Sequence, residues 1–219
     1  MTDYSTARRH MVDGQVRPND VTDLRVISAM LEVARERFVP PAAAALAYLD
    51  LDLALGEGTA SSRRLLKPLV LAKLLNAADL KATDRVLVVG CATGYAAAVL
   101  ASIVGEVVAL EQDAGLAKTA RATLSSLPNV SVVSGPLVDG WPQAAPYDLI
   151  LLEGATEVEP QGFLRQLKDG GRLLCVLGSP PGASATLYRR SGNEMGGRAV
   201  FDAAAAVLPG FEKRPEFAF

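Results

Sequence analysis

The sequence is poor in the residues that most often carry reactive chemistry. Its 219 residues include one histidine, two cysteines and one tryptophan. Cys91 and Cys175 form no cluster with metal-ligand spacing, and a reducing compartment would keep both as thiols, so we interpret them as packing residues. His10 stands in a polar leader, where a surface position is expected. We therefore expect no metal site.

Long apolar runs and a charge excess are also missing. No stretch approaches the ~20 consecutive apolar residues of a membrane span, and residues 1–16 are polar where a secretion signal requires an apolar run. The 22 basic and 24 acidic side chains are spread along the chain, with a formal net charge of −2. We expect a cytoplasmic protein without a nucleic-acid or membrane partner, although a local basic surface and the oligomeric state stay open.

What the sequence does contain is the pattern of one α/β domain. Half of the residues are hydrophobic, which suffices for a full core in one domain over 1–219. We divide it into an N-terminal helical region (1–80), a core (81–180) and a C-terminal hairpin and tail (181–219). Helices are expected over 22–37, 65–80, 114–127 and around 163–167, and a loop over 56–67.

Apolar runs alternate with helical patterns from Arg85 onward. This βαβ succession predicts a doubly wound, mostly parallel, Rossmann-like sheet. Near the C-terminus, ATLYRRSG and GRAVFDA flank the segment NEMGG, which predicts a hairpin turn appended to the sheet.

The segment RVLVVGCATGYAAAVLASIVGEVVALEQD, residues 85–113, reads as strand, glycine turn, helix and strand. A dinucleotide fingerprint G-x-G-x-x-G is not met, because Ala92 replaces its middle glycine and Tyr95 its last. No Gly-Lys-Ser or Gly-Lys-Thr follows, so a Walker loop is excluded more firmly. A nicotinamide dehydrogenase is thus the third choice. The plainest alternative is a tight turn at Gly90 and Gly94 with Glu111 as a solvated strand end.

The pattern V-L-x-x-G-x-x-x-G-Y, with an acidic residue ending the next strand, resembles the S-adenosylmethionine turn of Rossmann-like methyltransferases. The resemblance implies that the turn approaches the methionine portion and that the Glu111 carboxylate accepts hydrogen bonds from the ribose hydroxyls. The residues it implies for cofactor binding are Gly90, Ala92, Gly94, Tyr95, Glu111, Gln112, Gly135, Pro136 and Leu137.

Residues 8–180 are more specifically similar to protein-L-isoaspartate O-methyltransferases. The similarity lies in Met11-Val12, Phe38-Val39-Pro40, YDLILLEGA, and Gln166-Leu167-Lys168 followed by Gly170-Gly171. It implies methyl transfer from S-adenosylmethionine to the α-carboxylate of isoaspartyl residues in proteins or peptides. The ester then collapses to a succinimide, which reopens to aspartate and so repairs the chain.

The loop before the second helix departs from this family. Members carry Gly-x-Gly-Gln-Thr-Ile-Ser-Gln-Pro, whose serine helps to hold the substrate carboxylate, whereas residues 56–68 read GEGTASSRRLLKP. Anchoring on the glycines matches Thr59 and Ser61 to the family's Thr and Ser, and Ser62 is a further candidate. Anchoring on Pro68 puts Leu66 at the serine position, which predicts an apolar pocket beside the methyl group.

The two arginines of this loop, Arg63 and Arg64, either pair with a carboxylate or are solvated on the surface. Tight pairing with the nucleophile would stabilise its ground state and slow its attack.

The adenine region departs as well. The family's Gly-Asp-Gly is Gly135-Pro136-Leu137 here, so we expect one hydrogen bond fewer to the adenine amino group, with Asp139 and Trp141 as partial substitutes or as plain loop and packing residues. Val88 stands where many relatives have Glu. These departures keep a second function open, a degenerate relative that binds a ligand or partner without catalysis.

Overall fold

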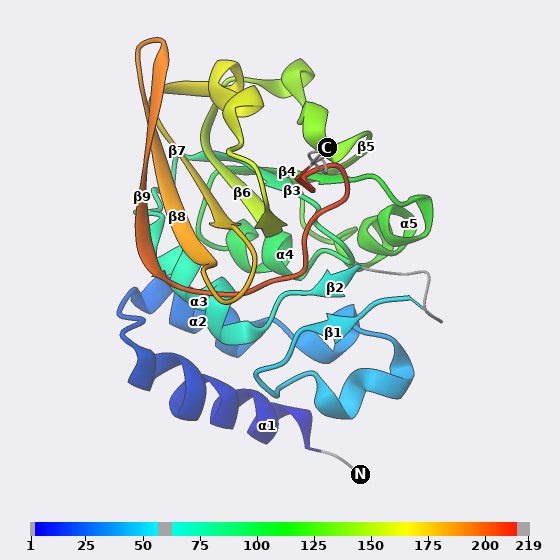
Figure 1. The fold of residues 1–219 in the computed structure, drawn as a ribbon. Coiled ribbons are helices and arrows are strands. Elements are labelled where there is room, and N and C mark those ends of the chain that lie inside the picture. Colours follow the sequence, from blue (N-terminus) through cyan, green and yellow to red (C-terminus); the bar gives the residue numbers. More distant parts are fainter. Residues whose placement is uncertain (1–2, 57–62, 214–219) are drawn as a thin grey trace, which may run out of the picture.

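A seven-stranded sheet forms the centre of the computed structural model, which describes residues 3–56 and 63–213 (Figure 1). The strand order is β5-β4-β3-β6-β7-β8-β9. The first five in this order run parallel, and β8 and β9 are antiparallel, which confirms the predicted mostly parallel sheet. The bounds are β3 Arg85–Val89, β4 Glu106–Glu111, β5 Val130–Ser134, β6 Tyr147–Thr156, β7 Leu167–Leu177, β8 Ser184–Ser191 and β9 Glu194–Asp202.

The helices are shorter than the periodicity predicts. Their bounds are α1 Tyr4–Met11, α2 Leu24–Glu32, α3 Pro68–Ala77, α4 Tyr95–Ala101 and α5 Ala114–Thr123. The expected helix 22–37 breaks because Val33 is extended, and Arg35–Phe38 forms a separate 3-10 turn. The expected helix 65–80 begins only at Pro68, whose fixed φ suits a first helical position. Before it, β2 (Arg64–Leu65) pairs with β1 (Leu53–Ala54).

The two faces of the sheet are covered differently. Alternate strand residues such as Val86, Val88 and Leu151 share one buried cluster with apolar residues of α2, α3, α4 and α5. The opposite residues, among them Val89 and Leu152, belong to a second cluster that is closed by short 3-10 turns and by C-terminal residues. The helix expected around 163–167 is one of these turns, Gln161–Gln166.

The predicted hairpin exists, but its turn lies earlier than NEMGG. Gly192 has φ +58°, a left-handed conformation that favours glycine, and it makes the reversal between β8 and β9. Glu194 to Gly197 therefore lie within β9. Gly197 is opposite Tyr188, and a Cβ there would lie 2.5 Å from the ring, so the small residue makes room for the aromatic side chain.

The register of the central strands brings three segments together at one edge. Val89 pairs with Leu110 of β4 and with Leu152 of β6. The next residues along each chain segment are Gly90, Glu111 and Glu153, at the carboxyl ends of parallel strands. This is the edge where ligands bind in open α/β sheets.

The longest α-helices in the described part of the chain, α3 and α5, have ten residues each. None of the helices in residues 3–56 and 63–213 is both long and apolar enough to cross a membrane. The same residues contain no group of three His, Cys, Asp or Glu side chains arranged to hold a metal ion.

A buried ion pair fastens the connection after α3 to the sheet. Arg172 of β7 and Asp84 are 5% and 3% exposed, with Nη2 and Oδ2 2.5 Å apart. We expect Asp84→Ala to lower the free energy of unfolding by about 3–5 kcal/mol, because it leaves a buried guanidinium without its partner. The exposed pair Arg85–Glu106 provides the control, since Glu106→Ala should cost less than about 1 kcal/mol. Guanidinium-induced unfolding measures both, and equal losses would contradict the prediction.

Candidate functional site

The glycine turn between β3 and α4 is held in left-handed backbone conformations. Gly90, Ala92 and Gly94 have φ values of +75°, +53° and +100°. Such values are routine for glycine but cost an alanine roughly 1–2 kcal/mol. The Gly90 and Cys91 amides both donate to the Leu110 carbonyl, at 2.9 and 3.0 Å. The turn is thus fastened to the end of β4 and lies buried at the sheet edge.

Glu111 is the charged residue to which the segments at this edge are hydrogen-bonded. Its side chain is fully buried. Oε1 accepts from the backbone amides of Gln112 and Asp113 at 2.9 and 3.0 Å, and Oε2 accepts from the Ala92 amide at 2.8 Å. The alternative of a solvated strand end is therefore wrong. The proposed contact with ribose hydroxyls stays a prediction.

Arg63 completes the set of donors around Glu111. Its Nη2 donates to Glu111 Oε2 at 2.7 Å and to the Gly90 carbonyl at 2.9 Å. Arg63 is 8% exposed, so the surface alternative is wrong for it, whereas Arg64 is exposed. The backbone explains the difference, because the Leu55 amide donates to the Arg63 carbonyl and turns its side chain toward the sheet edge.

A C-terminal segment, residues 203–213, crosses the same edge. Ala155 of β6 exchanges hydrogen bonds with Ala206 and Leu208, and the Glu157 amide donates to the Phe211 carbonyl at 2.9 Å. A Cβ on Gly90 would lie 2.9 Å from Leu208, and one on Gly154 would lie 2.7 Å from it. Arg63 and Leu208 thus fill the space above the turn. The sequence pattern predicted only an appended tail here.

Glu153 is a buried acid that the sequence analysis did not select. It is 3% exposed, and neither carboxyl oxygen has a hydrogen-bond partner. Burial raises the pKa of Glu153 to about 8, with Arg63 and Arg35 lowering it and Glu111 raising it. The available signal was a glutamate that directly follows the apolar run LILL within YDLILLEGA.

Further unpartnered polar atoms lie around Glu153. They are Arg35 Nη1, Arg63 Nε and the Tyr95 hydroxyl, all on buried side chains. The Arg35 guanidinium lies 4.6 Å from the centre of the Tyr95 ring, and Phe38 meets the same ring edge-on at 5.5 Å. Tyr95, predicted to bind cofactor, is therefore part of the core on the helical face. We call Arg35, Arg63, Tyr95 and Glu153 the buried polar cluster.

The family model for protein-L-isoaspartate(D-aspartate) O-methyltransferase matches residues 6–202. The chain belongs to this family. A relative from Methylorubrum populi, named Protein-L-isoaspartate O-methyltransferase, is 40% identical over 195 residues, which is 89% of each chain. One of the same name from Pelotomaculum thermopropionicum is 40% identical over 84% of this chain and 80% of its own.

Solved structures agree on the fold. A protein-L-isoaspartate O-methyltransferase superposes with a TM-score of 0.81 at 25% identity, covering 93% of this chain and 66% of that one. A Plasmodium falciparum protein assigned to the family, solved with S-adenosyl-L-homocysteine, gives 0.75 over 95% and 99% of the chains. Its 15% identity supports the fold alone.

The family's substrate serine has no described counterpart. Thr59, Ser61 and Ser62, the candidates from the glycine-anchored alignment, lie outside the described residues. The flanks are described, since β1 and β2 pair with Leu53 opposite Leu65. Because Arg63 directly follows Ser62 and reaches Glu111, the loop ends at the sheet edge. The catalytic role of Thr59, Ser61 and Ser62 stays a prediction.

In the alignment anchored on Pro68, Leu66 stands at the family's serine position, and its surroundings differ from those expected. Leu66 is buried, and its carbonyl accepts from Arg35 Nη2 at 2.8 Å. It lines a cavity of about 10 Å³ together with Arg63 and Glu153. The apolar pocket expected beside Leu66 is therefore wrong, because the loop brings charged side chains to the same place.

The residues predicted to contact adenine directly follow β5, the outermost strand on this side of the sheet. The Gly135 amide donates to the Glu111 carbonyl at 3.3 Å, and the Leu137 amide donates to Gln112 Oε1 at 3.3 Å. Pro136 is exposed. A Cβ on Gly135 would lie 3.4 Å from the Trp141 ring, so Trp141 is placed beside this predicted subsite.

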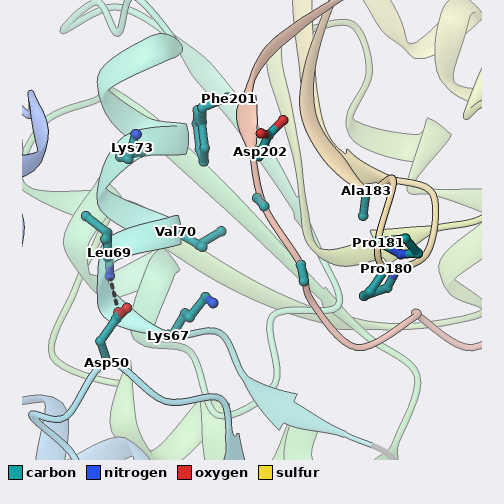
Figure 2. A pocket seen from close by; sticks show the side chains of 12 residues that line it. Asp50, Lys67, Leu69, Val70, Lys73, Pro180, Pro181, Ala183, Phe201 and Asp202 are labelled. Carbon is teal, nitrogen blue, oxygen red and sulfur yellow. Dashed lines mark hydrogen bonds between the residues drawn. The ribbon is translucent and has the colours of Figure 1, made fainter.

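A larger hollow of about 330 Å³ lies elsewhere, between the start of α3 and the end of β9 (Figure 2). Its Asp50 accepts from the Leu69 amide at 3.0 Å, and Lys73 Nζ lies 4.5 Å from the centre of the Phe201 ring. Asp50 and Lys73, two of the four charged side chains that line the hollow, thus already have partners. We assign no function to this hollow.

The buried acid predicts an unusual dependence of stability on pH. Because the pKa of Glu153 is about 8 in the fold against 4.5 ordinarily, the folded state holds the extra proton between these values. Each pH unit in this window lowers the free energy of unfolding by at most about 1.4 kcal/mol, or about 5 kcal/mol in total. Glu153→Gln should remove this loss, so the variant should gain on the wild type between pH 5 and 9.

Denaturant unfolding at both pH values measures the effect. Glu194→Gln on the exposed hairpin is the control. An identical pH dependence of all three proteins would show that Glu153 does not titrate in this window.

Proposed function

We propose that this chain transfers the methyl group of S-adenosylmethionine to the α-carboxylate of isoaspartyl residues in proteins and peptides, as a repair enzyme. Family membership over 6–202 is the observation that carries the proposal. The geometry supports it, because the glycine turn, Glu111 and the buried polar cluster meet at one sheet edge. We also propose a cytoplasmic location, in keeping with two buried, unpaired cysteines.

The residues at this edge fit the proposed cofactor once two side chains move. When bound, S-adenosylmethionine supplies a methyl group on an electrophilic sulfonium. Glu111 Oε2 would accept from the ribose hydroxyls in place of Arg63, and Gly90 leaves no Cβ in the way. Arg63 and Leu208 now lie against Gly90, so both must shift for the turn to be approached.

The reaction depends on how the chain positions the acceptor carboxylate more than on proton transfer. An α-carboxylate has a pKa near ~3.5 and is already ionised at pH 7, so no general base is needed. Holding its oxygen in line with the methyl carbon is worth up to about 7–11 kcal/mol. We propose that the segment containing Ser61 and Ser62, together with the buried polar cluster, provides this orientation. The resulting ester closes to a succinimide without further help.

Methyl transfer to a matched peptide pair tests the proposed function. With radiolabelled S-adenosylmethionine, the protein should methylate an isoaspartyl peptide and leave the normal aspartyl peptide unlabelled. Replacing Ser61 and Ser62 together by Ala should lower kcat/KM while cofactor affinity stays the same, since only the orientation of the acceptor is lost. Cofactor binding without transfer to either peptide would mean that the isoaspartyl assignment is wrong for this chain.

The C-terminal segment predicts opposite effects on stability and binding. Leu208→Ala should lower the free energy of unfolding by about 2–5 kcal/mol, because it leaves a cavity in the second cluster. It should also tighten binding of S-adenosylhomocysteine at least about tenfold, because less packing is lost when the side chain at position 208 moves away from Gly90. Leu173→Ala, in the same cluster but on β7, should destabilise without tightening. Calorimetric titration of the three proteins decides, and equal affinities would refute the displacement.

A further inference from the structure

The two buried acids of this edge stand on either side of the glycine turn. Glu111 ends β4 and Glu153 lies in β6, and both are level with Gly90, which follows the strand between them. Alternate neighbours along the two strands, such as Ala109 and Leu151, belong to the cluster beneath the helices, so both acids face this side of the sheet. Neighbouring strands are about 4.8 Å apart, which places the two acids on strands about 10 Å apart.

The Arg63 guanidinium lies above the middle position between these acids. A Cβ on Gly90 would lie 3.2 Å from its Nη2 and 3.3 Å from its Nη1. Nη2 donates to Glu111 Oε2 at 2.7 Å, whereas Nε has no partner. The backbone of Arg63 is fixed, because its carbonyl accepts from the Leu55 amide at 3.1 Å. The side chain can therefore rotate toward either acid from one fixed attachment point.

Glu153 is the acid to which this guanidinium is not bound. Both of its carboxyl oxygens are buried without a hydrogen-bond partner. None of the ion pairs in residues 3–56 and 63–213 includes it. Arg63 and Glu153 line one cavity of about 10 Å³. A space of about this volume is needed by a single water molecule, so no larger ligand fits between the two side chains. Movement of the Arg63 side chain itself can close such a gap.

We propose that Glu153 is a positioning residue for cofactor binding: when ribose hydroxyls replace Arg63 on Glu111, the guanidinium moves to Glu153, which loses its proton to solvent and pairs with it. The inference rests on the proposed function, because it concerns the movement that S-adenosylmethionine requires of Arg63. Without Glu153 the displaced guanidinium would be buried without a counter-charge, which is costly. Glu153 thus lowers the cost of the exchange at Glu111 while Arg63 stays within the fold.

The charges at this edge favour the exchange. Burial raises the pKa of Glu153 to about 8, so the acid is largely neutral at pH 7 while Arg63 is bound to Glu111. Arg35, Arg63 and Glu111 then carry a net charge of +1, and the sulfonium of the cofactor raises it to +2. Ionisation of Glu153 returns the net charge to +1. A guanidinium in direct contact also lowers the pKa of a carboxyl group, so the proton is released as the new pair forms.

Other ionisable groups lie around Glu153 on every neighbouring element. Burial raises the pKa of the Cys91 thiol and of the Tyr95 hydroxyl, so both stay neutral near pH 7. Glu153 is therefore the group expected to release the proton. The charged and titratable groups that face it are Arg35, Asp52, Arg63, Arg64, Cys91, Tyr95 and Glu111.

Proton release on cofactor binding is the first readout, and it does not require turnover. S-adenosylhomocysteine is titrated into the protein at pH 7 by calorimetry, in two buffers that differ in ionisation enthalpy. Wild type should release close to one proton per ligand bound, because Glu153 passes from largely neutral to ionised. Glu153→Gln should release close to none, and Glu194→Gln on the exposed hairpin should follow the wild type. Thermal unfolding of each variant checks that it is folded.

Cofactor affinity in a double-mutant cycle is the second readout. Glu153→Gln should weaken binding of S-adenosylhomocysteine at pH 8 at least about tenfold, because the displaced guanidinium then finds a neutral amide in place of a carboxylate. In an Arg63→Ala background no guanidinium is displaced, so the same Glu153→Gln change should alter the dissociation constant less than about twofold. A purely structural role of Glu153 would instead weaken binding equally in both backgrounds.

The outcomes separate this inference from the proposed function. Binding without proton release by wild type, or with proton uptake, overturns the inference and leaves the cofactor assignment intact, because Arg63 would then move away from Glu153. Equal proton release by wild type and Glu153→Gln, or equal effects of Glu153→Gln in both backgrounds, also overturns it. If S-adenosylhomocysteine does not bind, the exchange and the proposed function fail together. If proton release depends on Glu153 but no isoaspartyl peptide is methylated, the proposed function alone fails.

Discussion

The four hydrogen bonds accepted by Glu111 determine the shape of this edge. They come from the Ala92 amide in the glycine turn, from the Gln112 and Asp113 amides just before α5, and from Arg63 just before β2. One buried carboxylate therefore fixes three segments that are far apart in the sequence. Charge-assisted bonds of this kind are worth about 1.5–3 kcal/mol each, enough to hold Ala92 in a left-handed conformation.

The bond between Glu111 and Arg63 helps to explain why the space above the glycine turn is filled. Arg63 is bound by Glu111 and by the Gly90 carbonyl, and Leu208 is held over Gly90 because residues 206–208 pair with the end of β6. A ligand that donates hydrogen bonds to Glu111, as ribose hydroxyls would, must replace Arg63 on Oε2. The three backbone donors to Glu111 do not depend on Arg63, so the carboxylate stays in place during such an exchange.

The sequence predicts more of the fold than of the site. Apolar runs alternating with helical patterns located the strands of the core. The acid ending VVALE is buried in the structure, and its predicted contact with ribose stays a prediction. Local pattern does not report long-range contacts, however. The burial of Arg63 depends on its pairing across from Leu55, and the path of residues 203–213 depends on β6. Glu153 was missed because a strand assigned from its apolar residues gives no weight to an acid near its end.

The environment of Arg63 also answers a chemical objection to arginines beside a carboxylate nucleophile. A free guanidinium that paired in two-fold fashion with the acceptor would stabilise its ground state and slow attack on the methyl group. Here Arg63 Nη2 is already bound to Glu111 and to a carbonyl, which leaves Nε unpartnered. Its charge is neutralised locally by Glu111. While it stays on Glu111, Arg63 is therefore bound within the fold as an ion pair and does not offer a free two-fold guanidinium to an acceptor carboxylate.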